Sequence, residues 1–494
     1  MDLTGSRWRR VAAVLIVGLG FLARAPVGAA QEEYTRDWRE LRSENFRLVG
    51  NASERTLRRI GERLEEFRAA VVGVMPVYAE TDGTETVVVV FRHDAAMRPF
   101  KPSSNSSAFI ANGPGRIYVA LNGEQNLNRI IYRAYLYALN RPGSEWSRWM
   151  RVGASEFYST IQVRSGGEKV FLGSVVGSHL DWLERAFIPL GEFLHPDTRF
   201  EGDLQQTTLA AQAWALFHFM QLGRPGMAGR LPEFNRLMAE NGNDVAASAR
   251  TAFGVDLDTL QSEFLIYARS SVTFPALERT LPERIPDFDL PDAADLDETA
   301  ASYYLGELLL HRDRPEEARV WYERAIGLGG EYSPALTSLA LLSRGAGDDA
   351  DASAFLDRAI AAPDADYLPY FLRAYAFLRA NPGPTGLDQA EADLRFAIAD
   401  RPESPDAWYA LGQLLMRRPG TVGEAAEVLS QAVERSAASP IMRLAHARAL
   451  SMSGNELRAL GLLIGLAQST TDPNIRRQAR DMEAAIRERL PATR

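Results

Sequence analysis

The sequence predicts a mixed α+β domain followed by an all-α solenoid of helical hairpins. Runs of β-branched residues in the first half, such as TVVVVF at 86–91, are typical of buried strands. From about residue 298, small and large apolar residues recur with a period of 34 residues, which predicts stacked helical hairpins. The predicted segments are a leader at 1–30, an α+β domain at 31–274, a Pro-rich acidic linker at 275–297, about five repeats at 298–468 and a C-terminal cap helix at 469–494.

The first segment has the organisation of a secretory signal peptide. Arginines at 7, 9 and 10 precede an apolar run at 11–23, and small residues lead up to Ala30. The apolar run is shorter than the roughly 20 residues that span a bilayer. We therefore expect cleavage after Ala30 and a periplasmic or secreted protein with no membrane span once the leader is removed. An uncleaved N-terminal anchor is the alternative.

The composition excludes several classes of site and partner. The chain has no cysteine, so it has no disulfide and no thiolate metal site. Its formal net charge is −9 and no basic stripe interrupts it, so nucleic acid is not an expected partner. With 46% hydrophobic residues, the chain can build cores without disulfides.

Strands and helices alternate in the first domain. Residues 45–49 predict a short strand, and Ser53 is a suitable N-cap for the helix that follows. Apolar residues then recur at helical spacing from Leu57 to Val71. Residues 116–121 (RIYVAL) predict another strand, and the pattern from 127 onward is mostly helical.

The repeats resemble tetratricopeptide repeats. Small residues at the eighth and twentieth positions let the two helices of a hairpin approach closely, and larger ones fill the gap to the next hairpin. The signature positions of the four clearest units are Gly306, Ala318, Ala325, Ala340, Ala352, Ala359, Ala390, Ala397, Trp408, Gly412, Ala425 and Ala432. A fifth, weaker unit has Ala447, Leu450, Ala459 and Leu463. The resemblance implies a protein or peptide ligand on the solenoid. The alternative is that the repeats support oligomerisation or pack on the N-terminal domain.

Two consecutive helical stretches carry a second resemblance. The first is IIYRAYLYALN at 130–140, directly after the strand at 116–121, and the second is SRWMRVGASEFYST at 147–160. With DWRELRSENFRLVGN, LERAFIPLGEFL and QAWALFHFM, they resemble the peptidase MA-like domains of the gluzincin superfamily over roughly 36–270. In active members, an HExxH helix gives two zinc ligands and the catalytic glutamate, and a downstream NEGxAE segment gives the third ligand.

This chain departs from that pattern at each catalytic position. Arg133 and Tyr137 stand at the two histidine positions, Ala134 at the general-base position and Val152 at the third-ligand position. Only Gly153 and Glu156 of the downstream motif are retained. The resemblance therefore implies a gluzincin-like fold without zinc, without another cofactor and without peptidase activity.

Arg133 lies in an apolar helix, where a guanidinium is costly unless it is paired or reaches water. We expect an Arg133–Glu156 ion pair in place of the metal. The alternative is that Arg133 points into solvent at the mouth of the cleft.

The histidines offer no local replacement for the missing ligands, since none lies within four residues of another. They are His93, His179, His195, His218, His311 and His446. His218 lies in an apolar helix and is expected to be a hydrogen-bonded core residue.

These features predict an exported protein that binds proteins or peptides as an adaptor or scaffold. One alternative is an active hydrolase with a metal site elsewhere or a mechanism without zinc. Another is a purely structural assembly factor of the envelope, in which only the solenoid binds.

Overall fold

The computed structural model describes residues 32–75, 84–102, 106, 108–124, 128–139, 146–269, 275–380, 383–436, 439–470 and 472–489. The predicted leader and the cleavage position after Ala30 lie outside these residues. The described chain forms two compact units. The sheet unit comprises described residues within 1–59, 82–125 and 291–435, and the helical unit those within 60–81, 126–290 and 436–494. Both predicted domains thus contribute residues to both units.

A six-stranded mixed sheet forms the base of the sheet unit, in the order β4-β5-β3-β2-β1-β9. The strands are β1 (Arg39–Arg42), β2 (Phe46–Gly50), β3 (Glu85–Phe91), β4 (Ala108–Gly113), β5 (Arg116–Asn122) and β9 (Ala294–Asp295). β2, β3 and β5 run parallel, while β4 and β1 are antiparallel to their neighbours. The three strands predicted from sequence are present within a residue or two. The central strand β3 is buried from Thr86 onward, as a strand covered on both faces must be.

Helix α2 (Glu54–Val74) follows β2 and contributes to both units. The Ser53 Oγ accepts a hydrogen bond from the Thr56 amide at 3.2 Å, so the predicted N-cap is confirmed. The apolar residues predicted at helical spacing, including Leu57 and Phe67, are buried.

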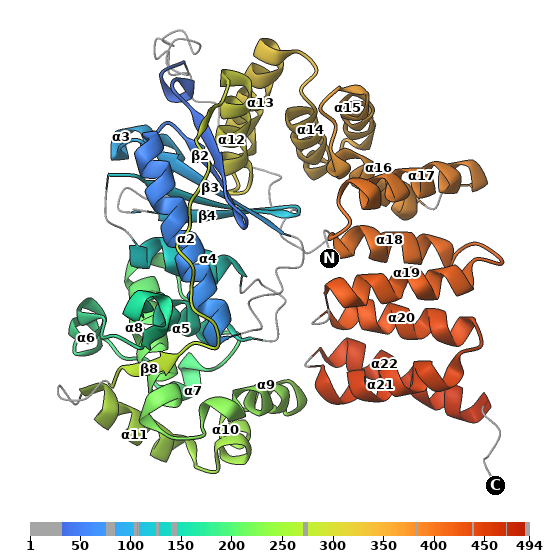
Figure 1. Ribbon diagram of the computed structural model, residues 1–494. Coiled ribbons are helices and arrows are strands. Elements are labelled where there is room, and N and C mark those ends of the chain that lie inside the picture. Colours follow the sequence, from blue (N-terminus) through green and yellow to red (C-terminus); the bar gives the residue numbers. More distant parts are fainter. Residues whose placement is uncertain are drawn as a thin grey trace, which may run out of the picture. The chain divides into compact units, whose positions relative to one another are not determined.

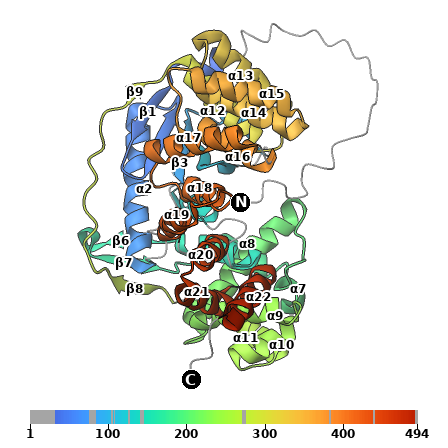
Figure 2. The same ribbon diagram turned by 90° about the vertical axis from the view of Figure 1, so that its right-hand side faces the viewer.

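Four repeats of the solenoid belong to the sheet unit, and each is an antiparallel hairpin (Figures 1 and 2). Their helices are α12 (Glu298–Leu310), α13 (Pro315–Gly329), α14 (Ser333–Ala346), α15 (Asp349–Ala361), α16 (Tyr367–Ala380), α17 (Pro384–Asp400), α18 (Pro405–Leu415) and α19 (Val422–Arg435). A Cβ on Gly306 would lie 2.5 Å from the Tyr322 ring, and one on Gly412 would lie 2.4 Å from Leu429. The signature alanines are buried, so the packing predicted for these positions is confirmed.

The fifth predicted repeat belongs to the helical unit. It consists of α20 (Pro440–Met452) and α21 (Glu456–Ser469), and α22 (Pro473–Arg489) follows as the predicted cap helix. Ala447, Ala459 and Leu463 are fully buried, and Leu450 is nearly so. Arg476 on α22 pairs with Glu240 at 3.2 Å, which ties the cap helix to the rest of this unit.

The remainder of the helical unit is built around a central helix, α8 (Gly202–His218). Its neighbours include α4 (Asn128–Leu139), α5 (Arg148–Tyr158), α6 (Gly177–Leu183) and α11 (Leu257–Arg269), and α7, α9 and α10 complete the unit. A small antiparallel sheet adds β6 (Gln162–Arg164), β7 (Lys169–Leu172) and β8 (Leu277–Thr280), in that order. The packing around α8 is aromatic, with Phe157 and Phe217 5.6 Å apart.

The segment predicted as a linker, 275–297, is instead part of both sheets. It supplies β8 to the small sheet and β9 to the large one, where Figure 2 shows β9 beside β1. Its prolines and aspartates suggested an unpaired connection, but Leu281, Ile285 and Leu290 recur every four or five residues and are buried. The Leu296 amide also donates to the Trp38 carbonyl at 2.8 Å. These contacts hold the segment in place along its length.

Candidate functional site

The helices that carry Arg133 and Glu156, α4 and α5, meet in the helical unit. α5 lies against α8 so closely that a Cβ on Gly153 would come 2.5 Å from the Ala213 carbonyl oxygen and 2.9 Å from the Phe217 Cβ. A carbonyl of a buried helix cannot move aside as a flexible side chain can. Gly153 is therefore required by packing alone, whatever motif it belongs to.

Glu156 lies one turn after Gly153 on α5, and its side chain is 1% exposed. Its carboxylate accepts three charge-assisted hydrogen bonds. Arg129 of α4 donates at 2.7 Å, Arg133 of α4 at 2.8 Å, and His179 of α6 shares a hydrogen bond with it at 3.1 Å. We call these four residues the Glu156 cluster. Both oxygens are occupied, as a buried carboxylate requires.

The partners keep Glu156 ionised. Burial by itself would raise the pKa of Glu156, but the hydrogen bond with His179 and the charges of Arg133 and Arg129 outweigh it and lower the pKa to about 2. The arginines are 34% and 37% exposed, so each reaches water as well as the carboxylate. The cluster therefore holds a buried negative charge under two half-exposed positive ones.

The predicted Arg133–Glu156 pair is confirmed by this geometry. The alternative, with Arg133 directed only into solvent, is wrong, although a third of the side chain does reach solvent. Ala134 is buried and Val152 is half-buried, and neither can donate or accept through its side chain. Tyr137 lies on α4, but its side chain is outside the described part of the chain.

Sequence reasoning missed two members of the cluster. Arg129 lies four residues before Arg133, one turn away on the same face of α4, so helical spacing could have nominated it. His179 is 23 residues from Glu156 along the chain, and α6 brings the two together. No local pattern pointed to that contact.

The other histidines have partners within the fold. His218 is fully buried between the Gly173 carbonyl at 2.9 Å and the Tyr267 hydroxyl at 2.7 Å, so its predicted role as a core residue is confirmed. Burial lowers its pKa despite the hydrogen bond to Gly173. His93 caps the short helix α3 (Asp94–Met97). Among the described residues, no group of three or more histidines and carboxylates is arranged to hold a metal ion.

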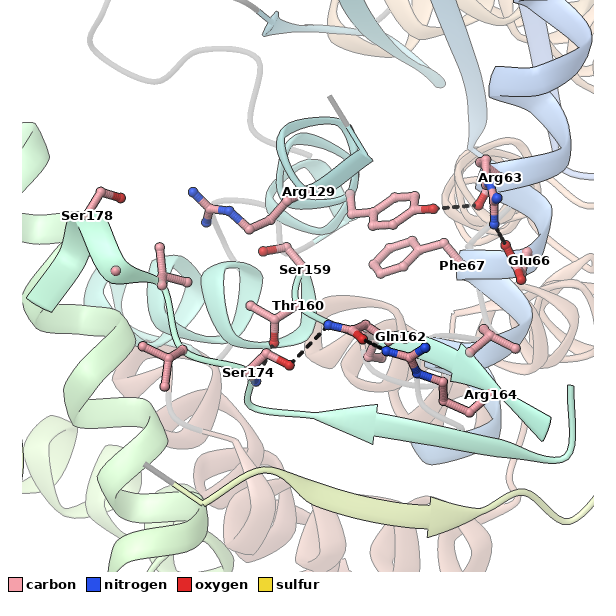
Figure 3. Close-up of a pocket in the computed structure, with 16 residues that line it drawn as sticks. Arg63, Glu66, Phe67, Arg129, Ser159, Thr160, Gln162, Arg164, Ser174 and Ser178 are labelled. Carbon is pink, nitrogen blue, oxygen red and sulfur yellow. Dashed lines mark hydrogen bonds and ion pairs between the residues drawn. The ribbon is translucent and has the colours of Figure 1, made fainter. Parts of the chain in front are cut away.

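A cavity of about 630 Å³ opens next to the Glu156 cluster (Figure 3). Arg129 belongs to both. The cavity is bounded by α2 and α4 on one side and by β6 and the segment 174–178 on the other. One wall is a stacked pair of rings, Phe67 and Tyr132, whose centroids lie 3.8 Å apart.

In the sheet unit, the first repeat is covered by the sheet. Tyr118 of β5 donates to the Glu307 carboxylate of α12 at 2.7 Å, and Tyr322 and Ser338 donate to the same group at 2.8 and 2.6 Å. Burial alone would raise the pKa of Glu307, but the hydrogen bond and charge of His311, with the hydrogen bonds from Ser338 and Tyr118, lower it to about 2. The repeats thus do pack on the N-terminal sheet, as the alternative interpretation of their role proposed.

The turn between β4 and β5 extends this contact to the third repeat. Arg116 binds Tyr303 of α12 at 3.0 Å and Asp366, just before α16, at 3.1 Å, while its Nε pairs with Glu85 at 2.9 Å. A Cβ on Gly115 would lie 2.2 Å from the Tyr367 hydroxyl. The turn and the repeat helices fit closely, and this part of the repeat surface is occupied by the chain itself.

Comparison with known proteins identifies the repeats. Residues 292–334 and 386–440 match a tetratricopeptide repeat family model. No curated protein matches the chain. Within the described residues, no helix is long and apolar enough to cross a membrane.

Several solved structures of repeat proteins are similar to parts of the chain. YrrB, described as a tetratricopeptide repeat protein with an unusual peptide-binding site, is 15% identical over 37% of this chain and 92% of its own, with a TM-score of 0.32. PilF of Pseudomonas aeruginosa is 18% identical over 39% and 90%, also at 0.32. A thermophilic repeat protein of Thermus thermophilus, TTC0263, is 20% identical over 37% and 98%, at 0.29. The chain carries tetratricopeptide repeats, identified by the family match and by the signature packing described above.

Proposed function

We propose that this protein is an exported, non-hydrolytic scaffold that binds an extended segment of a partner protein on its third and fourth repeats. Tetratricopeptide repeats are typical of proteins that bind other proteins, so the proposal concerns which part of the solenoid binds the partner. The proposal rests on a difference between the repeats. Equivalent positions contact the sheet in the first repeat but carry half-buried aromatic rings in the third and fourth.

In the first repeat, the positions three before and one after the signature glycine are Tyr303 and Glu307, and both contact β5. In the third repeat, the same positions are Phe371 and Tyr375, half-buried rings that stack at 6.1 Å. In the fourth, the ring is Tyr409, also half-buried. Aromatic side chains at a half-exposed helical face give contact area at little entropic cost, which suits recognition of a peptide segment.

The absence of hydrolysis is part of the same proposal. The Glu156 carboxylate is already neutralised by two arginines, whose positive charge opposes a metal cation at the same place. With Arg133 and Ala134 at the positions that the gluzincin resemblance assigns to a histidine ligand and the general base, the cluster serves to stabilise the unit. Export is supported by the composition of residues 1–30 and is tested by sequencing the mature N-terminus, for which we expect Gln31.

Site-specific photocrosslinking in the native host tests the binding face. A photoreactive phenylalanine analogue at position 371 or 375 should give the same discrete protein adduct. The matched control is the analogue at Phe396, an exposed aromatic position on α17 of the same repeat. Equal adducts at all three positions, or none at 371 and 375, would contradict the proposed face.

A further inference from the structure

The cavity beside the Glu156 cluster has the size and lining of a ligand site. Its volume of about 630 Å³ lies within the range of roughly 300–1,000 Å³ that such sites occupy. Three arginines line it from three different elements, Arg63 of α2, Arg129 of α4 and Arg164 of β6 (Figure 3). Because these elements are fixed by the core of the helical unit, the cavity is preformed.

The charges around the cavity leave an excess of positive charge. Arg63 is paired with Glu66, which also lines the cavity, at 2.7 Å. Arg129 shares the single charge of Glu156 with Arg133. Arg164 is exposed, and within the described part of the chain its guanidinium donates to the neutral side chain of Gln162. Among the described residues, Arg129 therefore has only a shared carboxylate and Arg164 only a neutral partner, and these two arginines make the cavity complementary to an anion.

The floor of the cavity is a strand edge. β6 pairs with β7 through residues 162–164, and β6 is the outer strand of the small sheet. The three residues of β6 all line the cavity, so the side of the strand opposite β7 faces the open space. An edge strand presents backbone donors and acceptors that an added strand can pair with.

We propose that this cavity binds an extended acidic peptide, which adds as a strand to β6 and places its carboxylates against Arg129 and Arg164. Alternate side chains of such a peptide point to opposite sides. Each wall offers an arginine and apolar surface. Arg129 and the Phe67–Tyr132 stack lie on the wall formed by α2 and α4, and Arg164 and the 49% exposed Val175 lie on the wall formed by β6 and residues 174–178. The ligand class is therefore a segment that presents both acidic and apolar side chains to each wall. This site belongs to the helical unit and does not depend on the binding face proposed for the third and fourth repeats.

Fluorescence anisotropy with the purified mature chain tests the proposal. The probe is a fluorescein-labelled hexapeptide of two glutamates, two valines and two glutamates in that order, so that both sides of the strand carry both residue types. The salt concentration is about 50 mM, so that charge contacts are only weakly screened. Three competitors define the chemistry: the same peptide with lysine for glutamate, the glutamate peptide with proline at its two central positions, and free acetate. We expect only the unlabelled glutamate–valine peptide to displace the probe at micromolar concentrations.

Variants locate the site. Arg164→Gln should weaken probe binding about three- to tenfold, as expected for an arginine–carboxylate contact that is partly open to water. The matched control is Arg279→Gln, since Arg279 is also exposed, on β8 of the same sheet, but does not line the cavity. Arg129→Gln should weaken binding as well, and circular dichroism shows whether that variant keeps its fold.

Three results would overturn the proposal. If Arg164→Gln and Arg279→Gln bind the probe equally, the cavity is not the site. If the lysine peptide competes as well as the glutamate peptide, charge does not select the ligand. If the proline peptide or acetate competes as well as the parent peptide, the arginines bind an anion without strand pairing.

Discussion

Replacement of Glu156 by glutamine is the sharpest test of the Glu156 cluster. Glutamine has nearly the same volume and one acceptor oxygen, but it carries no charge and turns two donors toward groups that are themselves donors. The change therefore removes the electrostatic contribution while the packing of α5 on α8 is preserved.

The pKa of Glu156 sets the size of the effect. It falls from 4.5 to about 2 in the folded chain, and each pKa unit is worth about 1.4 kcal/mol of preference for the ionised form. The cluster thus favours the carboxylate over a neutral group by at most about 3.5 kcal/mol. Because Arg129 and Arg133 are about one-third exposed, water screens part of their interaction with Glu156. We therefore expect Glu156→Gln to lower the stability of the helical unit by about 2 kcal/mol at pH 7.

The pH dependence has a defined sign. A carboxylate whose pKa is lowered by folding stabilises the folded state above its unfolded pKa of 4.5, and that contribution is lost as the pH falls toward 2. The cost of Glu156→Gln should therefore be constant above about pH 5 and should shrink steadily between pH 4.5 and 2. At the acid end, the wild-type carboxyl is protonated and resembles the variant.

The assay must report the unit that contains Glu156. The chain has two compact units, so a single unfolding midpoint can hide a local change. Hydrogen exchange of the α5 amides in increasing urea gives the free energy of opening of that region directly. The matched control is Glu278→Gln, whose solvent-exposed pair with Lys169 should contribute much less to stability. If the two variants cost the same, or if the cost of Glu156→Gln does not change between pH 5 and 3, the charge of Glu156 contributes nothing and the cluster is wrongly interpreted.

The packing and charge described above lead to three further predictions. Gly153→Ala should destabilise the helical unit by about 2 kcal/mol or more, measured by the same exchange of α5, because the added methyl meets a backbone carbonyl; a cost below about 0.5 kcal/mol would mean that α5 and α8 are not so close. Glu307→Gln should lower the free energy of opening of the α12 amides by about 2–3 kcal/mol at pH 7, and this difference should disappear between pH 4.5 and 2. The control is Glu316→Gln, on the exposed start of α13. After exposure to excess zinc and desalting, mass spectrometry of the mature protein should find far less than one zinc per chain. One tightly bound zinc per chain would favour the hydrolase alternative.

Much of the sheet unit could be predicted from sequence because its signals are local. The β-branched run at 86–91, the cap at Ser53 and the 34-residue register each depend on residues that are neighbours in the chain. The Arg133–Glu156 pair was also predictable, since a guanidinium in an apolar helix needs a partner and Glu156 was the nearest carboxylate on the next helix. Arg129 should have been predicted with it from its spacing of one helical turn.

The errors come from contacts between distant residues. The segment 275–297 has the composition of a linker, and its role in two sheets depends on partners at β1 and β7 that no local pattern reveals. His179 reaches Glu156 only because α6 packs on α8. The division into units is likewise set by how α2 and the helices α20 to α22 pack, so it does not follow the change from mixed to helical sequence.

The bond between Tyr118 and Glu307 joins residues that are 189 positions apart in the chain. A growing chain must therefore emerge from the ribosome well past the sheet before the face of β5 around Tyr118 can be covered. Until α12 arrives, β4 and β5 present an apolar face to other chains, and contacts of such high sequence separation form slowly. Biogenesis of this protein should consequently be sensitive to premature termination. A chain that stops before residue 298 keeps every strand from β1 to β9, yet lacks the helix that completes their core, and we expect it to aggregate.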